Sequence, residues 1–229
     1  MKIDITHHFI QSGNGFPLIL LHGNGEDSTY FRHQIDFFSA RYCVIALDTR
    51  GHGKSPRGNA PFTIRQFALD LYEFMKAHAI ERAHLLGFSD GGNIALTFVL
   101  QHPEMIDHLI LNGANLTPSG VKTTVQLPIV LGYHMASLFA KKSVNAAKNA
   151  EMLGLMVNEP NFQPEELHSL TMPTLVIAGK RDMIKEKHTR LIAENLPNGK
   201  LAILAGDHFI ANKNPTEFNR CTEQFLEDK

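Results

Sequence analysis

The chain has 229 residues, of which 43% are hydrophobic and 20% are charged, which are the proportions of a folded globular protein. Its formal net charge of -1 gives no indication of binding to nucleic acid or to an anionic membrane surface. No apolar run reaches the roughly 18 residues that a membrane span needs, and the first residues lack the apolar segment of a signal peptide. We therefore expect one domain with a substantial core and no contact with a membrane.

Short apolar runs alternate with amphipathic segments along most of the chain. The predicted strands are residues 3–10, 17–21, 42–47, 85–88, 109–111, 173–179 and 201–204. The predicted helices that alternate with them are residues 28–39, 63–78, the segment from Ser89 to about residue 100, 185–195 and 215–227. Continuous apolar runs such as 17–21 are typical of strands covered on both faces. The pattern predicts an α/β protein with a mostly parallel sheet flanked by helices.

Residues 114–170 interrupt this alternation. They contain no strand-like run and are predicted to be helical in three pieces, at 129–142, 144–157 and 164–170, which Gly and Pro separate. We interpret this stretch as a short helical lid inserted in a single domain. Residues 1–113 and 171–229 then form the core.

The sequence Gly87-Phe88-Ser89-Asp90-Gly91 lies where a predicted strand meets a predicted helix. A Gly-x-Ser-x-Gly motif in this place is typical of a sharp turn that exposes the serine hydroxyl in strained backbone geometry. Glycines on both sides remove the Cβ atoms that would clash in so tight a bend. A Gly-rich turn that merely contains serine is the alternative, and the rest of the chain must distinguish the two.

A serine hydroxyl is a poor nucleophile unless a base removes its proton and a third group orients that base. His208 follows the last predicted strand, and Asp182 follows the strand before it. Both are expected at the carboxyl edge of the sheet, where ligands collect in open α/β folds. The order Ser89, Asp182, His208 therefore predicts a catalytic triad.

Other residues at strand ends compete for these roles. His22 and His52 also lie in loops that follow strands, but glycines flank both in motifs that look structural. Asp207 is adjacent to His208, so the two side chains diverge, and we interpret it as a turn-former. Asn112 has no carboxylate with which to stabilise an imidazolium.

Backbone N–H groups are expected to stabilise the oxyanion that forms during acyl transfer. The loop His22-Gly23-Asn24-Gly25 lets the backbone approach the reacting centre, so the N–H of Asn24 is one candidate donor and the N–H of Asp90 is the other. Without Ser89 and His208, the same loop would be interpreted as an ordinary glycine-rich turn.

These motifs, together with Asp-x-Arg-Gly-His-Gly-Lys-Ser at 48–55 and Pro-Thr-Leu-Val-Ile-Ala-Gly at 173–179, resemble the α/β-hydrolase superfamily. The resemblance covers nearly the whole chain outside 114–170. It implies a mostly parallel sheet with a helical cap, Ser89 as nucleophile, His208 as base and Asp182 as acid. The 48–55 loop is expected to be architectural. Epoxide hydrolases and haloalkane dehalogenases of this superfamily carry aspartate at the nucleophile position, and the serine here excludes them.

Two features bear on the substrate. Met135 and Met156 in the predicted lid are candidate lining residues of an apolar acyl pocket, although methionines at helical spacing also serve as ordinary core. The Ser-Asp-Gly-Gly turn resembles that of hydrolases acting on amino-acid esters, and the Asp90 carboxylate would favour a cationic amine. An Asp90 side chain bonded to local backbone is the alternative.

We predict a serine hydrolase that cleaves a small carboxylic ester or related acyl bond, with a small-molecule substrate and without cofactor or metal. A lactonase, a thioesterase, a carbon–carbon bond hydrolase and a perhydrolase would use the same triad. A ligand-sensing receptor of the same fold is the alternative outside enzymes. The small number of cysteines, Cys43 and Cys221, indicates free thiols and a cytoplasmic chain. The sequence does not predict an oligomeric state.

Overall fold

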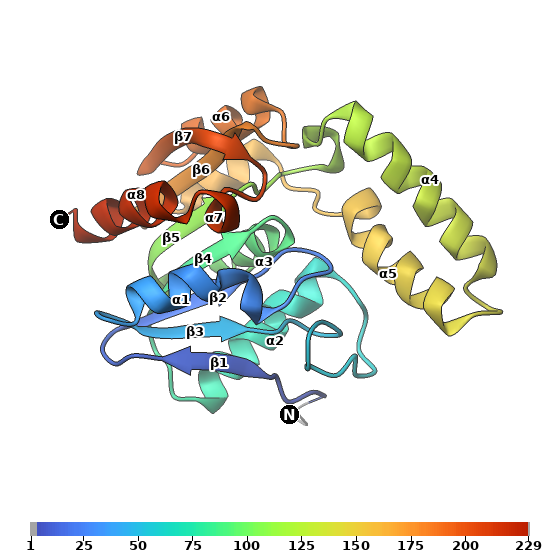
Figure 1. Ribbon diagram of the computed structural model, residues 1–229, viewed down its shortest axis with the longest axis horizontal. Helices are drawn as coiled ribbons and strands as arrows, with labels where there is room; N and C mark the ends of the chain where they lie inside the picture. Colours follow the sequence, from blue (N-terminus) through green and yellow to red (C-terminus); the bar gives the residue numbers. More distant parts are fainter. Residues whose placement is uncertain (1–3, 229) are drawn as a thin grey trace.

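The computed structural model describes residues 4–228 and contains a seven-stranded sheet in the order β1-β3-β2-β4-β5-β6-β7 (Figure 1). The strands are β1 (Phe9–Ser12), β2 (Pro17–Leu21), β3 (Cys43–Leu47), β4 (Ala83–Phe88), β5 (Ile106–Asn112), β6 (Thr174–Arg181) and β7 (Gly199–Asp207). β1 is antiparallel to β3, and the other neighbouring pairs are parallel. The predicted fold class, an α/β protein with a mostly parallel sheet, is confirmed.

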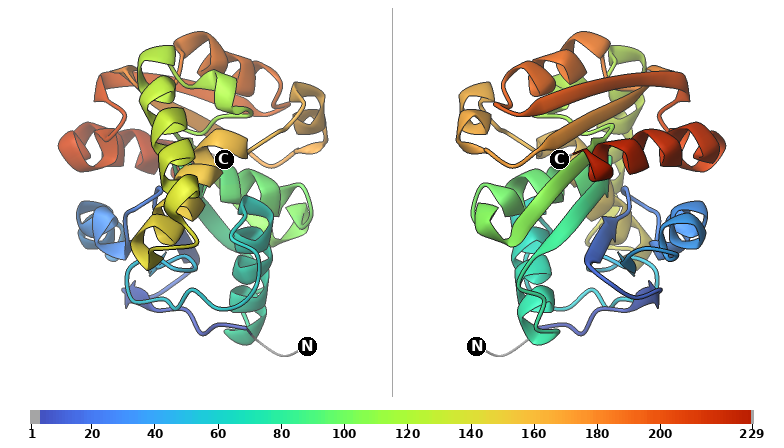
Figure 2. Two further views of the ribbon diagram at one scale, coloured as in Figure 1. Left: turned by 90° about the vertical axis from the view of Figure 1, so that its right-hand side faces the viewer. Right: turned by 90° about the vertical axis from the view of Figure 1, so that its left-hand side faces the viewer.

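Helices cover both faces of the sheet. The α-helices of the described residues are α1 (Arg32–Phe38), α2 (Ile64–Ala77), α3 (Asp90–Val99), α4 (Thr123–Phe139), α5 (Val144–Asn158), α6 (Glu186–Glu194), α7 (Ile210–Lys213) and α8 (Pro215–Glu227). α2, α3 and α6 pack on one face, and α1, α7 and α8 pack on the other (Figures 1 and 2).

β2 shows why its sequence is apolar at successive positions. Ile19 and Leu21 join the core cluster under α2 and α3, whereas Leu18 and Leu20 join the cluster under α1 and α8. Successive side chains of a strand point to opposite faces, so a strand between two helical layers has no polar face. All four side chains are fully buried, as the continuous run predicted.

Several elements differ from the sequence prediction: β4, β5 and β7 begin two or three residues earlier than predicted, and the predicted helix at 164–170 is a 3₁₀ helix at Pro164–Ser169. β1 begins at Phe9 rather than residue 3, because Phe9 pairs with Leu47 and β3 ends there; residue 3 of the predicted strand lies outside the described part. α4 begins at Thr123 rather than residue 129 and passes through Pro128. No residue of α4 is buried, so a distortion at the proline displaces no core packing. α7 was not predicted, since its length of four residues is too short for helical periodicity.

The loop that follows β3 is held by buried charges, which fits the architectural role that the resemblance implied for it. The Arg50 guanidinium is fully buried and donates to both carboxylate oxygens of Asp70 at 2.7 Å. The Asp48 carboxylate accepts hydrogen bonds from the backbone of Ser28 at 2.7 Å and of Lys54 at 2.9 Å. A buried guanidinium is stable only with such partners, so these contacts fix the loop against the sheet.

α4 and α5 form a hairpin that projects beyond the carboxyl ends of the central strands (Figure 1). Two contacts join α5 to loops of the core. The Asn24 side chain donates to the Met152 carbonyl at 2.7 Å, and Arg57 forms an ion pair with Glu151 at 2.6 Å. Among the described helices, none combines the length and apolar character needed to cross a bilayer. Cys43 and Cys221 are free thiols, as predicted, and both are partly buried.

Candidate active site

Ser89 occupies a one-residue turn between β4 and α3. Its backbone has φ 53° and ψ -119°, a positive φ that non-glycine residues rarely adopt. A Cβ atom at Gly87 would lie 2.3 Å from the Gly91 carbonyl oxygen, and one at Gly91 would lie 2.1 Å from the Leu21 carbonyl oxygen. Only glycine fits at either position, so the two glycines of the motif permit the turn that presents Ser89.

Three side chains from three strand ends meet at this turn. His208, which follows β7, places Nε2 3.0 Å from the Ser89 hydroxyl oxygen. Its other ring nitrogen, Nδ1, lies 2.7 Å from Oδ1 of Asp182, which follows β6. Both His208 and Asp182 are more than nine-tenths buried. The geometry matches a hydroxyl, a base and an orienting carboxylate in a continuous hydrogen-bonded chain.

The Asp182 carboxylate is itself held by backbone donors. Oδ1 accepts a hydrogen bond from the Ile184 N–H at 2.9 Å, and Oδ2 accepts a longer one from the Gly179 N–H at 3.4 Å. These donors orient the carboxylate toward His208 and partly compensate the loss of water around a buried negative charge.

Gly113 also shapes the site, and sequence reasoning missed it. This residue directly follows β5 and has φ +65°, and a Cβ atom there would lie 2.7 Å from Cε1 of His208. The imidazole therefore occupies space that any other side chain would fill. A glycine immediately after a predicted strand, at the edge that carries the triad, is the sequence signal that was available.

The two competing histidines serve the loops rather than the serine. His22 Nε2 accepts a hydrogen bond from the Thr49 N–H at 3.0 Å, and its Nδ1 lies 2.7 Å from the Gly23 carbonyl oxygen. His52 Nδ1 lies 3.0 Å from the Arg50 carbonyl oxygen. Burial lowers the pKa of both rings, that of His52 to about 4, so both are neutral near pH 7.

Asp207 and Asn112 likewise have other partners. The Asp207 carboxylate accepts a hydrogen bond from the Phe209 N–H at 3.0 Å and an ion pair from Lys213 at 2.6 Å, as expected for a residue that forms a turn. The Asn112 side chain donates to the Ile177 carbonyl oxygen at 3.4 Å, and the Asn112 backbone carbonyl accepts a hydrogen bond from the Ser89 N–H at 2.8 Å, which helps fix the strained turn. Asp182 is therefore the carboxylate that contacts the His208 ring.

The two expected oxyanion donors are the N–H of Asn24, in the loop after β2, and the N–H of Asp90, the residue after Ser89 and the first of α3. Within residues 4–228, the backbone N–H groups of Asn24 and Asp90 donate no hydrogen bond to another protein group. The Asp90 N–H is also at the start of α3, where the helix dipole favours negative charge. Glu26 supports the first loop by accepting the Gly23 N–H at 3.3 Å, and burial raises the pKa of Glu26 to about 7.

Residues 17–134, more than half of the chain, match the family model described as alpha/beta hydrolase fold. The chain belongs to the α/β-hydrolase fold family.

A full-length relative is the protein named "Putative carbamate hydrolase RutD" of Caulobacter sp. (strain K31). It is 28% identical over 258 residues, covering 98% of this chain and 96% of the relative. Among solved α/β-hydrolase structures, the enol-lactonase from Burkholderia xenovorans LB400 superposes with a TM-score of 0.82 at 20% identity, covering 98% of this chain and 97% of that one. A thermophilic esterase from Thermogutta terrifontis gives a TM-score of 0.78 at 19% identity, covering 97% and 93%. At these identities, the two structures show a common fold.

A narrow cavity adjoins the serine of this α/β-hydrolase. It has room for about one water molecule, roughly 10 Å³. Its lining residues are Ser89, Asp90, Asn115, Val121, Met156, Glu159, Met183 and Ile184. Met156 thus lies beside Ser89, whereas Met135 is half exposed on α4 and does not line this cavity. Sequence reasoning missed Glu159 and Asn115, because nothing in their local sequence indicates that they approach residue 89.

The Asp90 carboxyl group is buried at this cavity with one oxygen unpartnered. Oδ1 accepts a weak hydrogen bond from the Asn93 side chain at 3.3 Å, and within the described residues Oδ2 has no hydrogen-bond donor. Burial raises the pKa of Asp90 to about 6, because the surroundings disfavour the charged form. The side chain therefore does not bond to local backbone, which was the alternative to a role at the site.

Asp90 makes stability depend on pH in a defined direction. Its pKa is higher in the folded chain than the ordinary value of 3.8, so folding favours the protonated form and stability falls as pH rises from about 4 to about 6. Replacing Asp90 by Asn removes this dependence. We expect the unfolding free energy of the variant relative to the parent to increase by up to about 3 kcal/mol between pH 4 and pH 7. Urea unfolding at both pH values measures it, and a difference that stays constant with pH would contradict the assignment.

Proposed function

We propose that this chain is a serine hydrolase that cleaves a small carboxylic ester or related acyl bond through an acyl-enzyme. The hydrogen-bonded chain from Ser89 through His208 to Asp182 carries this proposal. His208 Nε2 takes the proton of the Ser89 hydroxyl as its oxygen attacks the carbonyl carbon, and Asp182 stabilises the resulting imidazolium. His208 then protonates the leaving group, and water repeats the cycle to release the acid.

The N–H groups of Asn24 and Asp90 are proposed to hold the oxyanion of both tetrahedral intermediates. One such donor contributes about 3 to 4 kcal/mol to transition-state stabilisation in a site without bulk water. Membership of the α/β-hydrolase family and the hydrolase names of its relatives support an enzyme rather than a receptor. Solved structures of this fold carry the names of an enol-lactonase and of a meta-cleavage product hydrolase, so the fold alone does not set the substrate and the acyl pocket must supply the specificity.

The cavity favours a small acyl group that carries an N–H donor. It is narrow, Asp90 is one of its lining residues, and Oδ2 of Asp90 is buried without a hydrogen-bond partner within the described residues. A buried acceptor without a partner is costly, so a substrate N–H that reaches it gains affinity. An amino-acyl ester would provide an ammonium group, and a carbamate would provide an amide N–H. The name of the Caulobacter relative makes the carbamate a specific second candidate.

Residues 114–170 are proposed to act as the lid of this site, with residues 1–113 and 171–229 as the core. The lid contributes Met156 and Glu159 to the cavity and contacts the oxyanion loop through the Asn24–Met152 hydrogen bond. Substrates larger than the cavity then require movement of the α4–α5 hairpin.

The test of the proposed function is covalent labelling followed by a substrate panel. An organophosphonate that traps activated serines is expected to add one label per chain, located by peptide mass spectrometry at Ser89. Turnover is then compared for p-nitrophenyl acetate, butyrate, glycinate and N-methylcarbamate. We expect the turnover of the acetate, the glycinate or the carbamate to exceed the turnover of the butyrate. Labelling elsewhere, or no turnover of any member together with an unlabelled Ser89, would refute the proposal.

A further inference from the structure

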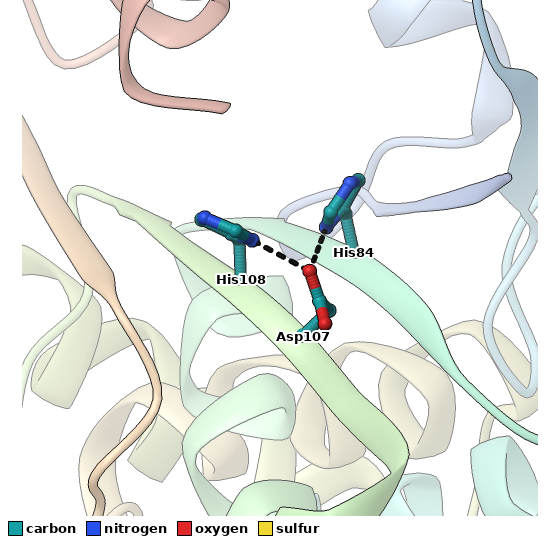
Figure 3. A group of neighbouring side chains, drawn as sticks. All are labelled: His84, Asp107 and His108. Atoms are coloured by element: carbon teal, nitrogen blue, oxygen red, sulfur yellow. Dashed lines mark hydrogen bonds and ion pairs between the residues drawn. The ribbon is translucent and has the colours of Figure 1, made fainter. Parts of the chain in front are cut away.

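Two histidines and an aspartate gather at the edge of the sheet opposite the triad. His84 is near the start of β4, and Asp107 and His108 are near the start of β5 (Figure 3). Ser89 follows the other end of β4, so this cluster is separate from the proposed active site.

A local irregularity of the β4–β5 pairing brings the three side chains together. Ala83 pairs with Ile106 and Leu85 pairs with Leu109, so the single residue His84 faces the two residues Asp107 and His108. Adjacent residues of a regular strand point to opposite faces. The extra residue in β5 is a β-bulge, a feature that re-aims side chains, and here both Asp107 and His108 face His84 (Figure 3).

The ring nitrogens converge on one carboxylate oxygen. Nδ1 of His108 lies 2.9 Å from Oδ2 of Asp107, and Nδ1 of His84 lies 3.7 Å from the same oxygen. All three ligand atoms lie within 4.8 Å of one another. Tetrahedral zinc with bonds of about 2.05 Å holds its ligands roughly 3.4 Å apart, so the two measured distances bracket the separation that a metal would impose.

His84 has no other use for its inward-facing nitrogen. Its side chain is more than nine-tenths buried, and within the described residues Nδ1 has no hydrogen-bond partner. Phe16 and Tyr42 contact the ring, with ring centroids 4.7 Å and 5.5 Å away, so the ring is held in place by packing. A buried nitrogen without a partner costs free energy, and a bound cation would compensate it.

The charges around the cluster leave one side of the carboxylate available. Arg82 pairs with Oδ1 of Asp107, whereas both histidines face Oδ2. An ordinary surface ion-pair network accounts for the contacts among the Arg82, Asp107 and His108 side chains. Within the described residues it leaves Nδ1 of His84 without a hydrogen-bond partner. Arg82 also orients the carboxylate, as residues behind metal ligands commonly do, and its own side chain is largely exposed.

We propose that His84, Asp107 and His108 form a binding site for a divalent first-row transition metal, with zinc as the reference ion. Two imidazoles and one carboxylate are ligands that zinc, nickel and copper prefer, whereas magnesium and calcium favour oxygen ligands alone. The partly exposed side of Asp107 leaves room for water as a fourth ligand. Because its ligands come from two strands, the bound ion ties β4 to β5. No metal site was predicted from the sequence, because these ligands lie on two strands and only the pairing of β4 with β5 brings them together.

The experiment titrates the full chain with Zn²⁺ by calorimetry and with Co²⁺ by visible absorption. We expect one saturable site, Co²⁺ bands typical of nitrogen and oxygen ligation, and a higher unfolding temperature with Zn²⁺ than with Mg²⁺. His108→Ala and Asp107→Asn are expected to weaken Zn²⁺ binding by roughly tenfold or more. Roughly tenfold is the effect of removing a residue that only hydrogen-bonds to a metal ligand, and removing a ligand itself should cost at least as much. His134→Ala, at an exposed position of α4, and His208→Ala are expected to retain it.

The controls separate this site from the alternatives. Loss of Zn²⁺ binding in His208→Ala would place the ion at the triad and overturn the proposal, as would unchanged binding in His108→Ala. If a variant at the cluster fails to fold by circular dichroism, NMR of the parent chain is the deciding measurement. Zn²⁺ must then shift the ring signals of His84 and His108, and shifts confined to other histidines would contradict the site.

Discussion

Replacing Ser89 by Ala is expected to reduce kcat/KM for p-nitrophenyl acetate by on the order of 10⁵-fold or more. The serine oxygen is the atom that would attack the carbonyl, and it lies 3.0 Å from the nitrogen that would take its proton. Without that oxygen, only the oxyanion donors and substrate binding remain to accelerate the attack of water. Steady-state hydrolysis rates measure the loss. The fraction of the parent enzyme that the organophosphonate labels gives the concentration of active sites.

Two further variants make this prediction specific. Ser39→Ala, at the end of α1 and remote from the site, is expected to keep full activity. The double variant Ser89→Ala/His208→Ala is expected to be no slower than Ser89→Ala alone, because residues that act as one unit are not additive. Substantial activity in folded Ser89→Ala would show that another group is the nucleophile.

Replacing Asp182 by Asn is expected to lower kcat on the order of 10³- to 10⁴-fold with little change in fold. The variant lacks the negative charge that would face the imidazolium of His208. Its amide also cannot satisfy its surroundings, since an NH₂ group in place of either oxygen would meet the N–H of Ile184 or of Gly179. The pH profile of kcat measures the effect: a changed pKa of the catalytic base shifts the profile, whereas a variant that is only less stable keeps it.

Asp207 provides the matched control for this experiment. It also carries a carboxylate and is adjacent to His208, but it bonds to the Phe209 N–H and to Lys213. Asp207→Asn is therefore expected to leave kcat within a few-fold of the parent value. If Asp207→Asn were the slower of the two variants, the orienting carboxylate would have been misassigned.

The sheet, and the convergence of Ser89, Asp182 and His208 at one edge of it, were predictable because they depend on local sequence patterns. The apolar run at 17–21 predicts a strand buried on both faces, and Leu18–Leu21 are fully buried. Once the strands are parallel, residues that follow them share one edge, so Asp182 and His208 were placed near Ser89 from their sequence positions. Gly87 and Gly91 also have the close contacts that their motif predicted.

Other features depend on contacts between segments that are distant along the chain. Glu159 and Asn115 reach the cavity because the chain from 114 to 170 returns to Ser89, and no local pattern indicates it. Met156 lines the cavity and Met135 does not, although both lie in predicted helices of the same stretch, residues 114–170. α4 begins before Pro128 rather than after it, because none of its residues is buried and a proline inside the helix therefore disturbs no core packing.

The amino-acid sequence by itself determined the layers, the strand order along the chain and the strained turn at Ser89, because burial periodicity and glycine sterics act within a few residues. The tertiary structure decided the environment of each polar group. Burial leaves an Asp90 oxygen without a donor, and the bulge in β5 turns Asp107 and His108 toward His84. Desolvation and side-chain direction depend on neighbours from other segments, so only the folded chain specifies them.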